Sequence, residues 1–327
     1  MLKALSIQNF RQFRDLKIEP LKRMNLIAGK NSSGKTAILE ALNLLFMQGD
    51  AVTLPSTFRS NHGTIQDDVE SFWRWLFYQR KPDNPITITA TNEQNTGFTV
   101  QVEMFPERRF ELRYLNETGS VLKNLSFFQG SSGNRGIISN WPKVSIFSTA
   151  PSSPTEDAEH FNQIAAKRGG RQRLTELLQT VEPTLHELQY LKLGTQPLVY
   201  ADVGMNDLIP ITQLGQGFVR LLRIFSEALL SESKIILIDE IENGIGYRAQ
   251  VDLWRGLATS AHQDDIQVFA TTHSYECIQA AHEVFSGSES YDFALHRLER
   301  INDGDVRVVT YDQATLDTAF ELNFEVR

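Results

Sequence analysis

A glycine-containing loop, GKNSSGKT at residues 29–36, constrains this chain more than any other feature of its sequence. It follows an apolar stretch predicted as a strand over 24–28 and precedes a helix predicted from Lys35 to about Met47. In that setting the pattern G-x-x-x-x-G-K-[ST] lets backbone N–H groups wrap a polyphosphate. Lys35 would reach the β- and γ-phosphates, and the Thr36 hydroxyl would hold Mg²⁺. The candidate nucleotide ligands are therefore Gly29, Lys30, Asn31, Ser32, Ser33, Gly34, Lys35, Thr36 and Ala37.

Charge and cysteine content narrow the function classes. The chain has 327 residues and a formal net charge of −8, so it carries no overall electrostatic attraction to nucleic acid. Cys277 is the single cysteine, which excludes an intrachain disulfide or a cysteine metal cluster. No apolar run is long enough to cross a membrane, and Met1–Phe10 alternates like a strand rather than a signal peptide. We expect a globular, cytoplasmic protein.

Two adjacent carboxylates end the segment KIILIDEIENG, residues 234–244. Its four apolar residues predict a buried strand, and Asp239 and Glu240 follow at the end of that strand. Such a pair can divide the work of phosphoryl transfer, with Asp239 in the metal's shell and Glu240 polarising the attacking water. The alternative is an acidic helix start, which is common after any strand.

A third segment, QVFATTHS at residues 267–274, ends a predicted strand at His273. An imidazole at the C-terminal edge of an α/β sheet lies where such sheets bind ligands, and it could contact a γ-phosphate or orient water. The alternative is a structural histidine with satisfied hydrogen bonds. The candidate catalytic residues are thus Lys35, Glu240 and His273, and the candidate metal ligands are Thr36 and Asp239.

A second glycine turn opens an apolar helix in ITQLGQGFVRLLRIF, residues 211–225. Free N–H groups and the positive end of the helix dipole make such a turn an anion site. Arg220 and Arg223 lie one and two helical steps further on, where they either add positive charge or belong to a solvated face.

The remaining pattern separates a β-rich half from an alternating half. Strands are predicted over 2–7, 16–18, 86–91, 98–105, 109–115 and 144–147, with an aromatic helix over 69–78. Helices over 158–167 and 171–181 and short strands over 188–193, 198–201 and 207–211 come next. Beyond them, strands over 235–238, 266–270, 293–298 and 306–309 alternate with helices over 247–261 and 275–285, which favours a parallel α/β sheet.

These motifs, in this order, resemble the ATPase domain of the ABC superfamily, in the soluble branch that contains SMC, Rad50, RecF and OLD-type proteins. The segments IQNFRQFRDLKI, GKNSSGKTAILEAL, LGQGFVRLL, LIDEIENG and TTHS are most similar to compact bacterial AAA15/AAA21-type ATPases. The resemblance covers the N-terminal part through the first helix and the part from Thr212 onward. It implies an α/β P-loop NTPase fold with an ABC-type head: a mixed or parallel core sheet, an antiparallel β lobe and a small helical lobe.

The resemblance also assigns a role to the second glycine turn. In that family the signature turn of one subunit meets the γ-phosphate held by the other subunit's phosphate loop, which implies that Leu214, Gly215 and Gly217 act in trans. This sequence departs from the LSGGQ form, because Gly215 stands where serine is usual and Phe218 where glutamine is usual. Backbone N–H groups and the helix dipole would then be the phosphate sensors.

The resemblance supports two further assignments and leaves the Q-loop residue unassigned. Glu242–Gly246 matches the D-loop that crosses the dimer seam, and Arg11 and Arg14 match basic residues that lie near the nucleotide in relatives. Ordinary surface charge is the alternative for both arginines. No glutamine follows the strand over 144–147, where relatives carry the Q-loop, and Gln129 is an outside candidate.

We expect one ABC-type ATPase domain over 1–327. Within it we place an inserted β-rich lobe over 50–143, a helical sub-lobe over 150–190, and over 205–327 the part of the core with the signature, Walker B and switch histidine. The segment before the signature is too short for the long coiled coils of SMC and Rad50 proteins, and little sequence follows the core for a TOPRIM nuclease like that of OLD proteins.

By resemblance, the function is an ATP- and Mg²⁺-dependent ATPase that closes as a head-to-tail homodimer. Relatives of this size often regulate a nuclease or toxin effector, encoded nearby, in antiphage defence. The first alternative is a RecF- or Rad50-like DNA-repair ATPase whose dimer clamps DNA. The second is the energy subunit of a transporter, which the missing glutamine and the unusual signature disfavour. The preference between ATP and GTP stays open.

Overall fold

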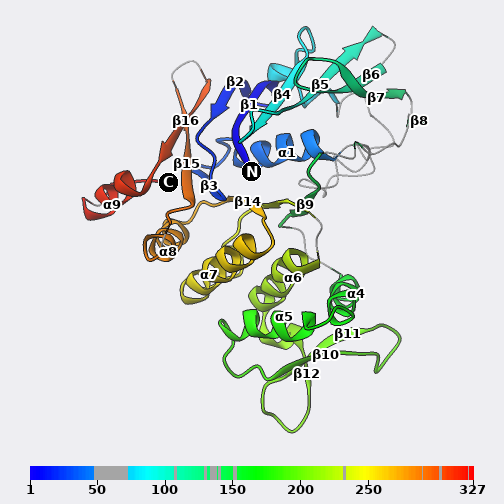
Figure 1. Cartoon of the computed structure of the whole chain (residues 1–327), viewed down its shortest axis with the longest axis vertical. Coiled ribbons are helices and arrows are strands. Elements are labelled where there is room, and N and C mark those ends of the chain that lie inside the picture. The colour runs from blue at the N-terminus through cyan, green and yellow to red at the C-terminus, as the bar shows by residue number, and fades with distance from the viewer. Residues whose placement is uncertain are drawn as a thin grey trace.

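The computed structural model describes most of the chain as three sheets with helices packed between and against them (Figure 1). The described residues are 1–47, 73–106, 109–128, 131–132, 138, 141–149, 153–230, 233–288, 290–301, 304–322 and 324–327. Among these residues, no helix is long and apolar enough to cross a membrane.

The core is a six-stranded sheet in the order β16-β15-β3-β14-β13-β9. Its strands are β3 (Met24–Gly29), β9 (Val144–Phe147), β13 (Ile235–Ile238), β14 (Gln267–Thr271), β15 (Phe293–Arg300) and β16 (Val306–Tyr311). All neighbours pair in parallel except β16, which runs antiparallel to β15 at the edge. The four residues of β13 are all buried, because helices or another sheet cover both faces, and this explains the unbroken apolar run in the sequence.

A seven-stranded antiparallel sheet, in the order β2-β1-β4-β5-β6-β7-β8, forms the second layer. Its strands are β1 (Leu2–Phe10), β2 (Phe13–Ile18), β4 (Ile86–Asn92), β5 (Gly97–Phe105), β6 (Arg109–Leu115), β7 (Val121–Phe128) and β8 (Ser131–Ser132). Helix α1 (Lys35–Phe46) lies between this sheet and the core sheet (Figure 1), and its buried side chains join both in one apolar cluster. The helix after the phosphate loop is therefore held from two sides.

The antiparallel layer differs from the sequence expectation in its membership. The sequence groups the strands of residues 2–7 and 16–18 with the phosphate loop, whereas β1 pairs with β2 on one edge and with β4 on the other. The hairpins after residue 86 thus extend a sheet that starts at the N-terminus. The expected aromatic helix over 69–78 lies partly outside the described residues, and its described end continues into a 3₁₀ turn, Tyr78–Arg80.

Helices cover the other face of the core sheet, and a small sheet packs in turn against the first two of them (Figure 1). These elements are α4 (Pro154–Ala165), α5 (Gly170–Gln179), β10 (Glu187–Leu191), β11 (Leu198–Asp202), β12 (Ile209–Pro210), the 3₁₀ turn η4 (Ile211–Leu214), α6 (Gln216–Leu230), α7 (Tyr247–Gln263), α8 (Tyr275–Ser286) and α9 (Gln313–Glu321). The predicted helices and short strands of this region are present, with ends shifted by a few residues. Alternate residues of the core strands face the two covers: Ile236 contributes to the helical cluster, and Leu237 to the cluster around α1.

Three of the observed helices and strands have no counterpart in the sequence prediction: β7, β8 and α9. Helix α9 is capped by Asp312, whose carboxylate accepts a hydrogen bond from the Thr315 N–H at 3.0 Å. Its aromatic residue Phe320 packs edge-on against Tyr275 of α8, with ring centroids 5.7 Å apart. An Asp cap followed by apolar residues at helical spacing was the available signal for α9.

Candidate functional site

The phosphate loop leaves β3 and enters α1 as the sequence predicts. Ser33 is buried, while Lys30, Asn31 and Ser32 are exposed. The Lys35 ammonium donates to the carbonyl oxygens of Gly29 at 2.7 Å and Lys30 at 3.2 Å, so it lies folded over its own loop. Burial lowers the pKa of Lys35, against the opposing field of Asp239, Glu240 and Glu242. A partly desolvated cation in a loop of backbone donors matches a polyphosphate.

Gly34 shows why the loop needs glycine. Its φ is +108°, and a Cβ placed there would overlap the Gln12 side-chain amide and the Phe13 ring. The turn between β1 and β2 therefore rests directly on the phosphate loop. Gln12 is a neighbour of the candidate site that the sequence did not single out.

Asp239 joins the phosphate loop to the ends of two core strands. Asp239 is 6% exposed, and its carboxylate accepts hydrogen bonds from the Thr36 hydroxyl at 3.1 and 3.2 Å. The Thr271 hydroxyl, at the end of β14, donates to Asp239 Oδ1 at 2.6 Å. Thr36 and Asp239 are separated by 203 positions in sequence, and the parallel register of β13 and β14 brings them together with Thr271.

Glu240 is held in an unusual backbone conformation. Its φ is +47°, in the left-handed region that residues other than glycine rarely adopt. Its N–H donates to Thr271 Oγ1 at 2.8 Å, while Arg220 Nη2 of α6 donates to the carbonyls of Asp239 at 2.6 Å and Glu240 at 2.9 Å. The backbone of the carboxylate pair is thus fixed from both sides. This contact is evidence against a solvated-face position for Arg220.

The oxygens at this point suit a small hard cation. The Thr36 hydroxyl and the Asp239 carboxylate lie within hydrogen-bond distance of each other, and both are ligand types that Mg²⁺ prefers. Magnesium sites in nucleotide-binding proteins take one or two such groups and complete their shell with phosphates and water. The residues present therefore fit a magnesium–nucleotide complex.

His273 follows β14 and lies beside the D-loop. Its Nδ1 is 3.2 Å from Glu242 Oε1, and its backbone N–H donates to the same oxygen at 2.9 Å. The His273 side chain is 54% exposed, whereas that of Glu242 is 9% exposed. Glu242 thus orients a histidine whose ring stays accessible. The sequence places Glu242 in the D-loop but does not predict its contact with His273.

The two glycines of the signature turn are required for different reasons. A Cβ at Gly217 would overlap the Gly244 carbonyl, so the start of α6 packs backbone to backbone against the D-loop. Gly215 has a φ of +98°, and a Cβ there would have no atom within 4 Å. Gly215 and Gln216 are exposed, while Leu214 packs against the helical core. The turn therefore presents an open surface at Gly215.

The basic residues of the first hairpin differ from each other. Arg11 is ion-paired with Glu40 of α1, with Nε 2.9 Å from Oε2, and its side chain is 11% exposed. Arg11 therefore lies beside the helix that follows the phosphate loop, one turn beyond Thr36. Arg14 is exposed on β2.

Two other residues named from the sequence remain. Arg223 is 3.3 Å from Asp157 of α4. The outside Q-loop candidate, Gln129, lies outside the described residues.

The sequence did not predict the two residues that hydrogen-bond to Asp239 and Glu240, Thr271 and Arg220. Thr271 stands next to Asp239 in the strand register, because Ile238 pairs with Ala270, and this register was its only signal. The sequence marks Arg220 only as a positive charge. Its acceptors could not be predicted, because they are backbone carbonyls nineteen and twenty positions away.

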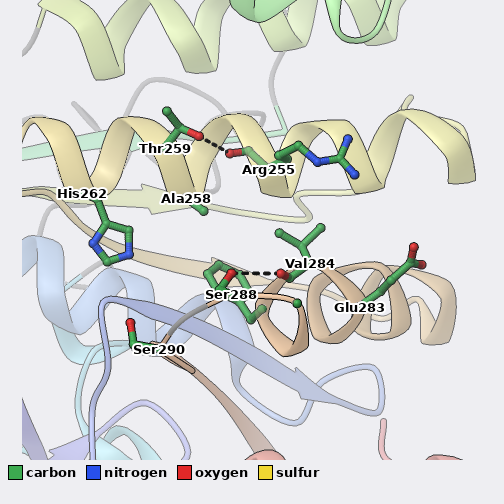
Figure 2. Close-up of a pocket in the computed structure, with 10 residues that line it drawn as sticks. Arg255, Ala258, Thr259, His262, Glu283, Val284, Ser288 and Ser290 are labelled. Carbon is green, nitrogen blue, oxygen red and sulfur yellow. Dashed lines mark hydrogen bonds between the residues drawn. The ribbon is translucent and has the colours of Figure 1, made fainter.

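A separate open groove of about 660 Å³ lies between α7 and α8 (Figure 2). Its lining includes Arg255, Thr259 and His262 from α7 and Glu283 from α8. It lies toward the C-terminal ends of these helices, which lead into β14 and β15, whereas the phosphate loop and Asp239 follow the opposite ends of the core strands. None of the sequence-predicted site residues line it.

Comparison with known proteins gives a family match over most of the core. A family model described as "AAA domain, putative AbiEii toxin, Type IV TA system" matches residues 24–278. A protein named ATP/GTP phosphatase from Helicobacter pylori is 23% identical over 328 residues, covering 87% of this chain and 88% of that protein.

Shorter matches link the chain to DNA-repair ATPases. The DNA replication and repair protein RecF of a Marinomonas species is 30% identical over 104 residues, which is 26% of its length. The DNA double-strand break repair Rad50 ATPase of Archaeoglobus fulgidus is 46% identical over 61 residues, or 6% of its length. Among solved structures, an SMC head bound to the C-winged helix domain of ScpA superposes with a TM-score of 0.56 at 13% identity, over 98% of this chain and 99% of that one. The predicted fold class is confirmed, since the chain has an SMC head-like fold.

Replacing Thr271 with valine should lower steady-state ATP hydrolysis by about 10- to 100-fold, because the Glu240 N–H loses its acceptor and Asp239 loses one of its two hydroxyl partners. Affinity for nucleotide, measured by calorimetry, should change much less. Thr271→Ser retains the hydroxyl and serves as the matched control, expected within a few-fold of the parent. Equal hydrolysis by the valine and serine variants would contradict the role given to this hydroxyl.

Proposed function

Because the chain belongs to the family described as "AAA domain, putative AbiEii toxin, Type IV TA system" and is an ATPase of the SMC/RecF type, we propose that it works as an ATP-driven switch. In this proposal two copies close head to tail around two Mg·ATP complexes, and hydrolysis opens them. The observation that carries the proposal is the contact of Thr36 with Asp239, which joins a phosphate loop to a carboxylate pair. We also propose one ATPase domain with two lobes, in which the β-rich lobe over 50–143 shares its sheet with β1 and β2.

The proposed roles follow from the geometry. Lys35 would turn from its loop carbonyls to the β- and γ-phosphates, while residues 29–37 donate backbone N–H groups. Thr36 and Asp239 would hold the magnesium ion, which when bound neutralises phosphate charge. Glu240 would accept a proton from the attacking water, and its fixed backbone keeps the carboxylate aimed during turnover. His273, oriented by Glu242, would contact the γ-phosphate.

The second half of each site would come from the partner copy. The exposed turn at Gly215 offers backbone N–H groups and a helix N-terminus, and no described side chain lies within contact distance of a Cβ there. An anion held on another chain can therefore approach it. Leu214 and Gly217 would fix the turn by packing, against the helical core and the D-loop respectively.

Glu240→Gln should bind ATP with Mg²⁺ but hydrolyse it at least about 100-fold more slowly, since an amide cannot accept the proton of water. The closed dimer should then accumulate with ATP and should be detected by analytical ultracentrifugation. The same variant with ADP is the control and should sediment as the nucleotide-free protein does. Hydrolysis at the parental rate would remove Glu240 from the role of base.

A mixing experiment tests whether the sites are shared. Gly215→Asp places a carboxylate where the partner's γ-phosphate would lie, and like charges in a partly desolvated seam repel each other. Lys35→Ala removes the loop cation. Each variant alone should be inactive, and a mixture should recover hydrolysis, because the heterodimer contains one complete site only when the halves come from different chains. Gly215→Asn, which carries the same backbone strain without the charge, is the control and should retain more activity than Gly215→Asp.

The biological role we propose is regulation of a protein effector in antiphage defence. The toxin–antitoxin wording of the family description supports it. The RecF match favours the alternative of a dimer that clamps DNA, although the net charge of −8 opposes binding to a polyanion.

Binding of duplex DNA separates the two roles. With ATP and the Glu240→Gln variant, we expect no retention of a fluorescent duplex at moderate salt, because few phosphate contacts survive there without a basic surface. The ADP-bound protein is the control. ATP-dependent binding whose affinity falls steeply with salt would support the clamp and count against the effector role.

A further inference from the structure

Arg220 connects two parts of the chain that the proposed function places in different active sites. It lies on α6, five residues after Gly215 of the signature turn, and its guanidinium reaches the backbone of Asp239 and Glu240. In a head-to-tail dimer, the signature turn of a subunit serves the partner's ATP, whereas Glu240 serves the subunit's own ATP. The Arg220 side chain thus links the helix that carries the signature turn to the backbone that carries Glu240.

The contact is placed where a small movement has a large effect. Glu240 holds a left-handed backbone conformation, which persists only while its surroundings fix it. Thr271 fixes its N–H side and Arg220 fixes its carbonyl side. A shift of α6 would therefore act on the carbonyl side first.

Burying the Arg220 guanidinium carries a desolvation cost, which a residue needed only for packing would not require. Burial lowers the pKa of its guanidinium, with Arg223 adding to the effect and the carboxylates of Glu242, Asp239 and Glu240 opposing it. An apolar side chain would pack this position without a desolvation cost. Arg220 donates to the backbone carbonyl oxygens of Asp239 and Glu240 rather than to their carboxylates, which leaves both carboxylates for metal and water.

We propose that Arg220 is a positioning residue that couples the two composite sites of the dimer. A γ-phosphate bound at the signature turn pulls on α6, and the Arg220 contacts transmit this displacement to the Glu240 backbone of the same subunit. Each site then reaches its full rate only when the neighbouring site is also occupied. Because linkage is reciprocal, the carboxylate pair also holds the signature turn in position for the partner's phosphate. This inference rests on the proposed head-to-tail dimer.

The first test uses single variants. Arg220→Ala should lower ATP hydrolysis by about tenfold or more while ATP affinity stays within a few-fold, the pattern of a lost transition-state interaction. Arg220→Lys should recover part of the rate, since an ammonium can still donate to both carbonyls. Arg223→Ala removes the same charge from the same helix at its contact with α4 and should hydrolyse like the parent. Equal rates for Arg220→Ala and Arg223→Ala, with matching thermal melts, would overturn the proposal.

The second test uses the mixed dimer of Gly215→Asp and Lys35→Ala. Its one complete site takes Glu240 from the Gly215→Asp chain and the signature turn from the Lys35→Ala chain. Adding Arg220→Ala to the Gly215→Asp chain removes support from the working Glu240. Adding it instead to the Lys35→Ala chain leaves that Glu240 intact and loosens only the signature helix.

The second site of this mixture binds no ATP, so the mixture tests the reciprocal arm of the coupling, in which the carboxylate pair holds the signature turn of the Lys35→Ala chain. Activity should fall about fivefold or more when Arg220 is missing only from that chain. Arg223→Ala in the same position is the control and should leave the mixture unchanged. Unchanged activity with Arg220→Ala on the signature chain would overturn the coupling. If the original mixture shows no recovery, the shared dimer site itself fails, and that outcome is separate from any effect of Arg220.

Discussion

The carboxylate of Asp239 is the interaction on which the site depends. It accepts hydrogen bonds from Thr36 at the start of α1 and from Thr271 at the end of β14, and Asp239 itself directly follows β13. Three elements separated by up to 235 positions thereby meet at one nearly buried side chain. A buried carboxylate without partners would be costly, so the register of β13 and β14 and the position of α1 are tied to its satisfaction. The Asp239 hydrogen bonds therefore serve both the candidate metal site and the packing of the core.

The two-sided cover of the core sheet keeps that contact in place. Helix α1 is packed between the core sheet and the antiparallel sheet, which leaves the Thr36 end little freedom to move relative to β13. On the other face, α6 packs against α4, α5 and α7, and its start rests on the D-loop backbone at Gly244. The phosphate loop thus belongs to the layer around α1, and the signature turn belongs to the helical layer. The Thr36 hydroxyl from the first layer and the Arg220 guanidinium from the second both contact Asp239.

The sequence predicted what local pattern can encode. The GKNSSGKT loop, the apolar run before Asp239 and the strand ending at His273 carry their spacing within a few residues, and the elements around them were found. Sheet membership was not encoded in this way: β1 reads as part of the phosphate-loop unit, yet it pairs with β4 about eighty positions away. The contacts of Thr271 and Arg220 could not be predicted for a similar reason, because the tertiary structure determines their partners. The partners of Arg220 are also backbone carbonyls, which no side-chain pattern indicates.

The difference between Gly215 and Gly217 decides how the signature turn can be studied. Both belong to one short motif, but only Gly217 is required by contacts within the chain, since any side chain there would overlap the Gly244 carbonyl. A substitution at Gly217 would therefore disturb the fold and a dimer contact together. At Gly215 the space is open and the requirement is the positive φ alone, which Asp and Asn violate to a similar extent. The charge at that one exposed position can thus be varied while the backbone strain is held constant, and this isolates an intermolecular phosphate contact from the packing of α6.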